Sequence, residues 1–199
     1  RIPFHTYREI KEKDIMKLSR FFSIILHPIF IPFLTLYISI LKLPNILILN
    51  YQIKIIFLIT FLFTIFFPLI NIFFFILLKK VKTLELELLS ERLLVLCCTI
   101  IWFVIGFFLL KDILFYSPIL KRIYLGSIFI MSLAMIVSKK WKISLHMIGI
   151  SGACGTFISL GLLYGGFQDL IITSILLSGV LGYSRLKENA HSPQQIYAG

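Results

Sequence analysis

The stretch that decides the fold is "LLVLCCTIIWFVIGFFLL", Leu93 to Leu110, which contains no charged residue. A helix that crosses the hydrocarbon core of a bilayer needs about 20 mostly apolar residues. The apolar residues form a long run that does not alternate with polar ones, which favours a helix over a half-exposed strand. In lipid the backbone must satisfy its own hydrogen bonds, and a helix does so within one segment. The run therefore predicts a transmembrane helix.

The composition of the whole chain supports the same conclusion. The 199 residues are 59% hydrophobic and only 15% charged, and the mean hydropathy is +0.98. Soluble domains are about 45–50% apolar and about 25% charged. We therefore expect an integral membrane protein, and the bias toward Ile, Phe and Lys is typical of an AT-rich bacterial genome, which indicates a bacterial inner (plasma) membrane.

Five further apolar runs predict five further spans. Helix-disturbing prolines lie within some of them, so that the first span, with Pro28 and Pro32, is expected to be kinked. The final "QQIYAG" is interpreted as the start of a seventh helix. The predicted fold is therefore all-α, a polytopic transmembrane helix bundle with six visible spans and the start of a seventh. The five runs are Phe21–Leu41, Ile53–Leu78, Arg122–Ser138, Ile143–Tyr164 and Phe167–Tyr183.

The domain organisation follows from these runs. Residues 1–20 form a polar N-terminal segment that does not resemble a signal peptide, and residues 21–199 form one transmembrane domain. The chain begins with Arg1 rather than Met, and we expect both natural ends to lie beyond the sequence.

The net charge of +11 does not indicate nucleic acid, because the basic residues flank apolar runs. Membrane lipids with anionic headgroups are the expected partners. With six crossings, one membrane face carries most of the basic residues, and the positive-inside rule places that face in the cytoplasm. The segments on that face are 1–20, 79–92, 139–142 and 184–192.

Polar residues gather in three segments on this face, Lys79–Arg92, Lys139–His146 and Ser184–Gln195. They contribute Arg92, His146, Arg185 and His191. Arginine suits a phosphate because its planar fork donates two parallel charge-assisted hydrogen bonds. A neutral histidine can act as nucleophile or as general acid–base. The three segments therefore predict an anion site with acid–base chemistry.

The third segment, "SRLKENAHSPQQIYAG", resembles the third motif of the type 2 phosphatidic acid phosphatase superfamily, which shares its fold with vanadium haloperoxidases. That motif reads Ser-Arg, five residues, His, three residues, Asp, and Ser184-Arg185 is followed by "LKENA" and His191. "ISLH" resembles the second motif, Pro-Ser-Gly-His, in Ser144 and His146. "SERL" resembles the end of the first motif in Arg92. The resemblance covers residues from about 80 to 199.

The resemblance implies a mechanism that uses no metal and no cofactor. His191 would attack phosphorus and form a phosphohistidine, and His146 would protonate the leaving oxygen. Arg92 and Arg185, with the backbone or hydroxyl of Ser144, would hold the phosphate oxygens. The substrate implied is a lipid phosphate or polyprenyl diphosphate, so the chain would be a phosphoric monoester or diphosphate hydrolase. Most bacterial relatives carry this site on the periplasmic side, whereas the charge distribution places it in the cytoplasm.

The chain departs from the family pattern at several positions. The first-motif lysine is replaced by Glu85 and its proline by Leu93. The second motif has Ile143 for Pro and Leu145 for Gly. The aspartate expected to orient the nucleophile is Gln195, whose carbonyl can accept an imidazole N–H but carries no charge.

Two other functions stay open for these reasons. The first alternative is a degenerate member of the family that binds lipid phosphates without turnover. The second alternative is a transport or assembly subunit in which the polar segments only set the topology. In that case the arginines would extend to the headgroups and the histidines would bond to neighbouring helices.

The cysteines carry no chemistry in this interpretation. Their spacing indicates neither a disulfide framework nor a metal site, so they are expected to be small buried hydrophobic residues. They are Cys97, Cys98 and Cys154.

Overall fold

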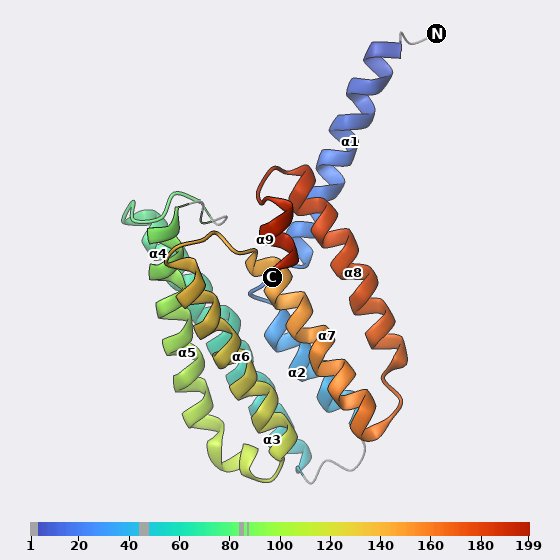
Figure 1. Cartoon of the computed structure of the whole chain (residues 1–199). Coiled ribbons are helices and arrows are strands. Elements are labelled where there is room, and N and C mark those ends of the chain that lie inside the picture. The colour runs from blue at the N-terminus through green and yellow to red at the C-terminus, as the bar shows by residue number, and fades with distance from the viewer. Residues whose placement is uncertain (1–3, 44–47, 84–85, 87) are drawn as a thin grey trace.

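The computed structural model describes residues 4–43, 48–83, 86 and 88–199. Within these ranges the chain consists of helices with short connections, and no strand occurs in them (Figure 1). The elements are α1 (Phe4–Ile25), α2 (Ile31–Lys42), α3 (Asn50–Phe61), the π-helix η1 (Leu62–Phe66), α4 (Phe67–Leu77), α5 (Leu89–Phe115), α6 (Pro118–Ser138), α7 (Leu145–Tyr164), α8 (Gln168–Lys187) and α9 (Pro193–Tyr197).

Five helical segments in the described ranges are long and apolar enough to cross a membrane. Four of them are the helices α5 to α8, and α3, η1 and α4 together form the fifth, Asn50–Leu77. The length and apolar composition of these helices confirm the prediction of an all-α integral membrane protein. The residues Pro193–Tyr197 form the short helix α9.

The first predicted span, Phe21–Leu41, is not one helix. Helix α1 ends at Ile25 and α2 begins at Ile31, so the predicted kink is a complete break. The imidazole Nδ1 of His27 accepts the backbone N–H of Ile29 at 3.3 Å, which stabilises the turn between the two helices. The prediction of six long spans is therefore wrong for this segment, since α2 alone has 12 residues.

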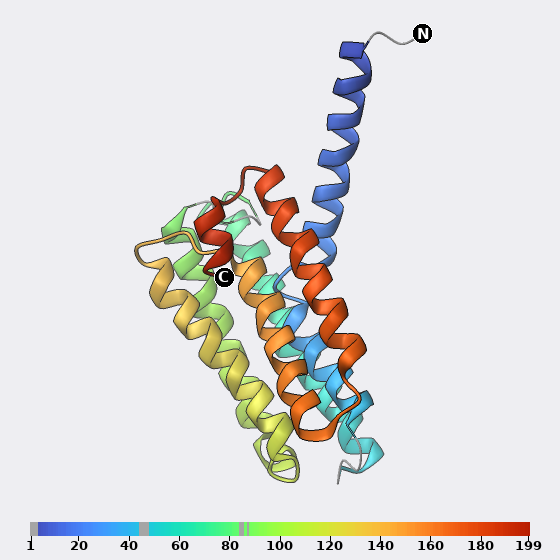
Figure 2. The same cartoon turned by 45° about the vertical axis from the view of Figure 1, so that its right-hand side comes forward.

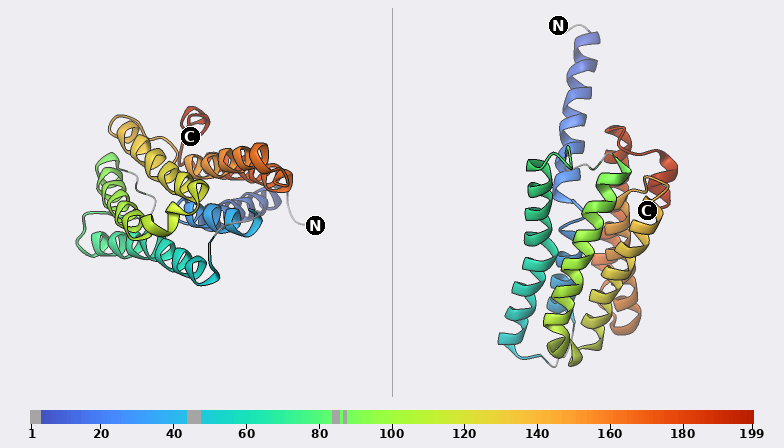
Figure 3. Two further views of the ribbon diagram at one scale, coloured as in Figure 1. Left: turned by 90° about the horizontal axis from the view of Figure 1, so that it is seen from below. Right: turned by 90° about the vertical axis from the view of Figure 1, so that its left-hand side faces the viewer.

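The helices lie side by side around two larger apolar cores, and a smaller apolar cluster joins the end of α4 to the start of α5. One core joins α2, α3, α5 and α6, and its most buried side chains include Ile56 and Leu110. The other joins α2, α7 and α8 around Phe157 and Leu181. Figures 2 and 3 show the long helices running roughly parallel or antiparallel, with the N-terminal part of α1 projecting beyond the bundle.

The two ends of the bundle differ in their polar groups. At one end Lys42 of α2 and Asp169 of α8 form an exposed ion pair of 2.6 Å. At the other end lie the last turn of α4, the first turn of α5, the connection from α6 to α7, the end of α8 and α9 (Figure 1). The predicted polar segments therefore meet at one end of the bundle, called the basic end below.

Candidate functional site

Two hydrogen bonds join the three polar segments at the basic end. The Nη2 group of Arg92, in the first turn of α5, donates to the carbonyl of Ile143 at 2.6 Å. The backbone N–H of Ser144, which precedes α7, donates to the carbonyl of Gln195 in α9 at 3.2 Å. Segments that are far apart in the sequence therefore form one cluster around the first turn of α7.

Arg92 is a buried guanidinium with unused hydrogen-bonding capacity. Its residue is 2% exposed, and its Nε and Nη1 atoms have no partner among the residues that the structure describes. A buried charge is costly unless it is paired, and a buried N–H without an acceptor adds to that cost. Arg92 therefore offers two free donors to an anion.

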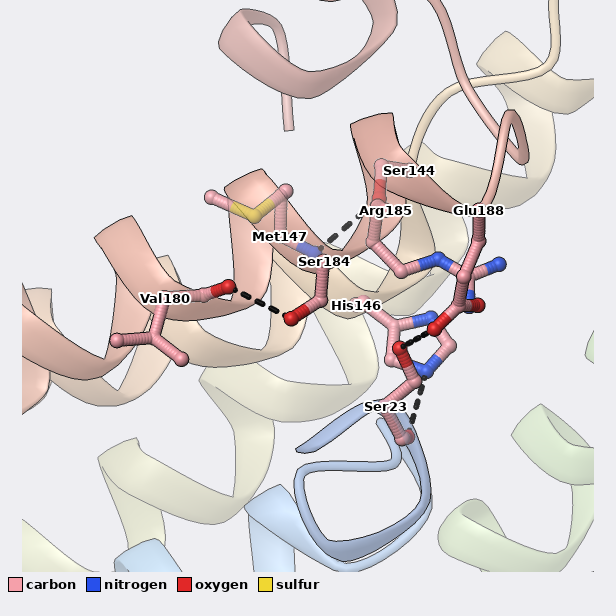
Figure 4. Close-up of polar contacts among 8 residues, drawn as sticks. All are labelled: Ser23, Ser144, His146, Met147, Val180, Ser184, Arg185 and Glu188. Atoms are coloured by element: carbon pink, nitrogen blue, oxygen red, sulfur yellow. Dashed lines mark hydrogen bonds and ion pairs between the residues drawn. The ribbon is translucent and has the colours of Figure 1, made fainter. Parts of the chain in front are cut away.

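Arg185, at the end of α8, lies in a second buried network (Figure 4). Its Nη1 group donates to Glu188 Oε2 at 2.8 Å, and the hydroxyl of Ser23 in α1 donates to the other carboxylate oxygen at 2.9 Å. The Nε atom of Arg185 has no partner within the described ranges. The sequence patterns did not indicate Glu188 or Ser23 as part of the site. Glu188 lies three residues after Arg185, a spacing that permits a helical ion pair, whereas nothing local connects Ser23 with them.

His146 connects α7 with the end of α1. Its Nε2 atom lies 3.1 Å from the carbonyl oxygen of Ser23 (Figure 4). A carbonyl only accepts, so this contact assigns the proton to Nε2 and leaves the lone pair on Nδ1. The ring also packs edge-on against His27, with centroids 5.3 Å apart. His27, interpreted from the sequence as part of a kink, thus also contacts a candidate site residue.

His191 is held by Gln195. The Nδ1 atom of His191 lies 3.1 Å from Gln195 Oε1, which also accepts the backbone N–H of Ser192 at 3.1 Å. The second bond identifies the amide oxygen, so Nδ1 of the imidazole is the donor and its Nε2 carries the lone pair. Ser192 and Gln195 form a capping box at the start of α9, which fixes the amide in place. The contact that the spacing of His191 and Gln195 permits is thus present.

His191 is neutral near pH 7. Burial lowers its pKa to about 4, and the bond to Gln195 opposes this shift. The positive charges of Arg185, Arg92 and Lys142 lower the pKa further, in that order. His191 lies outside the spanning helices and within electrostatic reach of Arg92 and Arg185. The lone pair on its Nε2 atom is free to react.

Ser144 is fully buried and caps α7. Its hydroxyl oxygen accepts the backbone N–H of Met147 at 3.4 Å, and its own backbone N–H is bonded to Gln195. The hydroxyl proton is the group of Ser144 that is left to donate to a ligand. The N-terminus of α7 adds a partial positive charge next to it.

No group of three His, Cys, Asp or Glu side chains that could hold a metal ion occurs in the part of the chain that the structure describes. The three cysteines are free thiols. Cys97 is exposed on α5, so its predicted burial is wrong; a small thiol on an apolar face suits contact with lipid as well as it suits a core. Glu85 lies outside the described residues.

Comparisons of the chain with protein-family models, with curated proteins and with solved structures gave no match.

Proposed function

We propose that this chain is a membrane phosphatase that acts on a lipid phosphate or polyprenyl diphosphate through a phosphohistidine. The single observation that carries the proposal is a neutral, oriented imidazole, His191, within electrostatic reach of the buried guanidiniums of Arg92 and Arg185, which have unused donors. Phosphoryl transfer is mostly positioning and charge stabilisation of the equatorial oxygens, and these groups are suited to both tasks. A bacterial plasma membrane is the location that goes with this function.

The proposed first step transfers the phosphoryl group to His191. The lone pair on its Nε2 attacks phosphorus while the Nδ1–H stays bonded to Gln195. The bond from phosphorus to the lipid oxygen breaks, and that oxygen takes a proton from His146, which acts as imidazolium after its Nδ1 has bound a proton from water. Because the Nε2–H of His146 is bonded to the carbonyl of Ser23, this transfer requires His146 to exchange that acceptor for the leaving oxygen.

The second step releases phosphate. Water attacks phosphorus, the nitrogen–phosphorus bond breaks, and His146, neutral after the first step, takes a proton from the attacking water. Arg92 and Arg185 hold the phosphoryl oxygens in both steps. The spare donors are Nε and Nη1 of Arg92 and Nε of Arg185.

One observation favours a second function, lipid phosphate binding without turnover. Gln195 carries no charge, so it fixes the tautomer of His191 but does not stabilise the imidazolium character that develops as the N–P bond forms. Arg185 also already has a carboxylate partner in Glu188. A binder needs the arginines alone, whereas an enzyme also needs His191.

The test is release of inorganic phosphate from a short-chain lipid phosphate by the purified chain in detergent, with a chelator present and with vanadate as inhibitor. We expect vanadate-sensitive release that is lost in His191→Ala. His5→Ala, in the first turn of α1, is the matched control and should keep the wild-type rate. Equal release by wild type and His191→Ala would overturn the mechanism. Arg185-dependent binding without release would favour the second function.

A further inference from the structure

A second buried polar region lies in the middle of the bundle, away from the basic end. A small cavity there is lined from α2, α3, η1, α5 and α6. It has room for about one water molecule. Its hydroxyl-bearing lining residues are Thr60, Thr64, Tyr124 and Ser127.

Three of these hydroxyl groups have no hydrogen-bond partner among the described residues. They belong to Thr60, Thr64 and Tyr124, whose residues are 1%, 2% and 3% exposed. Ser127 differs because its hydroxyl donates to the carbonyl of Ile123 at 3.1 Å. A buried hydroxyl without a partner costs about 1–3 kcal/mol. A ligand that forms hydrogen bonds with all three would offset this cost.

Elsewhere in this chain, helical threonines satisfy their hydroxyls within their own helix. Thr35, Thr99, Thr156 and Thr173 each donate to the carbonyl four residues earlier, at 2.7–2.8 Å. Thr60 and Thr64 do not, although they lie in a continuous helical segment. Thr64 lies within the π-helix η1, whose wider turn shifts the carbonyls relative to the side chains, and single π turns are frequent at functional sites.

The phenol of Tyr124 reaches this region through a space that Gly106 leaves. A Cβ atom on Gly106 would collide with the Tyr124 hydroxyl and would lie 2.8 Å from Cβ of Phe63. The absence of a side chain at position 106 thus brings the phenol from α6 across α5 toward η1. The close approach and the π turn together leave three residues with unpartnered hydroxyls around one cavity.

We propose that this cavity is a binding site for one internal water molecule, held by the hydroxyls of Thr60, Thr64 and Tyr124. The ligand is uncharged, because none of the cavity's lining side chains is ionised near pH 7. It is small, because the cavity has room for about one water molecule. A buried water typically forms about three hydrogen bonds, which is the number of free hydroxyls here. The water joins α3, η1 and α6 where the regular helical bonding of Asn50–Leu77 changes.

The test measures cross-relaxation between water protons and threonine methyl groups in the full chain, labelled at the threonine methyls and held in detergent micelles. We expect cross-peaks to water at Thr60 and Thr64. Thr83, in an exposed connection, is the positive control, and Thr35, which is buried with a satisfied hydroxyl, is the negative control. Single Thr→Ser variants assign each methyl signal.

Absence of the water cross-peak at both Thr60 and Thr64, with Thr83 positive, would overturn the proposal. Removal of the hydroxyls gives a second measurement. Tyr124→Phe should weaken both cross-peaks. In thermal unfolding, the variant that combines Thr60→Val, Thr64→Val and Tyr124→Phe should lose less than the sum of the three single losses, because the water leaves together with its partners. Strictly additive losses would contradict a shared ligand.

Discussion

The two buried polar regions of this molecule hold different kinds of group. The basic end contains full charges, with Arg92 and Arg185 below 5% exposed, whereas the mid-bundle cavity contains only neutral hydroxyls. Both regions have unpartnered donors, so the difference lies in charge and in depth. A charge near a helix end is close to water and headgroups, while a charge at the bilayer centre costs about 2.5–3.5 kcal/mol on insertion scales. The chain therefore places its buried arginines at the end of the bundle and only neutral polar side chains around the cavity in the middle.

The largest expected effect comes from a charge placed in the middle. Thr64 is close to the centre of the Asn50–Leu77 span, and Thr64→Lys should cost about 3 kcal/mol in folding or insertion. Thr83→Lys, in the exposed connection at the basic end, should cost nothing measurable. The measurement is the fraction of monodisperse protein after extraction and its unfolding temperature. Equal behaviour of the two lysine variants would remove the distinction between the regions.

The next largest effect tests the packing that brings Tyr124 to the cavity. Gly106→Ala should destabilise the fold by about 2 kcal/mol, because the new methyl group overpacks against Tyr124 and Phe63. Gly126→Ala in α6 is the matched control, since no atom lies within 4 Å of its added Cβ, and it should be neutral or stabilising. Thermal unfolding of the two variants checks this. A stable Gly106→Ala variant would contradict the close approach.

A smaller effect is expected at the basic end when the charge is kept and the planar fork is removed. Arg185→Lys should weaken vanadate inhibition about tenfold, which is the loss of about one charge-assisted hydrogen bond of about 1.5 kcal/mol. Arg122→Lys, exposed in the first turns of α6, should leave inhibition unchanged. If lysine serves as well as arginine at position 185, a point charge suffices and the proposed clamp is wrong.

The smallest effect concerns the group that orients His191. Gln195→Asp places a carboxylate beside the imidazole and should raise the pKa of His191 from about 4 by about one unit. His191 is then still mostly neutral at pH 7, so phosphate release should not fall, and in both proteins it should decline as the pH approaches that pKa. Gln194→Asp, exposed on the same short helix, is the control. Histidine signals followed by NMR titration report the pKa directly.

Much of the basic end could be predicted from the sequence, because helix length fixes which segments share a membrane face. The meeting of Arg92, Ser144 and Gln195 follows from that topology and was expected. The break between α1 and α2 was expected only as a kink. Proline predicts a disturbed helix, but whether the helix bends or breaks depends on whether side chains form hydrogen bonds with the backbone groups that the break leaves free. Here His27 bonds the N–H of Ile29 and His146 bonds the carbonyl of Ser23.

The remaining features depend on contacts that no local pattern contains. Ser23 meets Glu188 across 165 positions of sequence. In the sequence Thr60 and Thr64 resemble ordinary helical threonines, whose hydroxyls donate to the carbonyl four residues earlier. Their hydroxyls lack that bond beside the π turn between α3 and α4, which the sequence does not indicate. The roles proposed for His146, His191 and the arginines stay predictions, since the geometry brings these groups together but does not by itself include a reaction.

The break at residues 26–30 also has a mechanical consequence. Helix α1 has 22 residues and is therefore about 33 Å long, and its last turns pack on α8 through the buried Ser19 and Ser23. The rest of the helix projects beyond the bundle (Figure 2). A tilt of about 10° at the break would displace the far end by about 6 Å over that length. His146 and Glu188 both contact Ser23, close to the break. A small displacement of Ser23 caused by a change of ligand or charge at the basic end would therefore become a larger displacement at the N-terminus of α1.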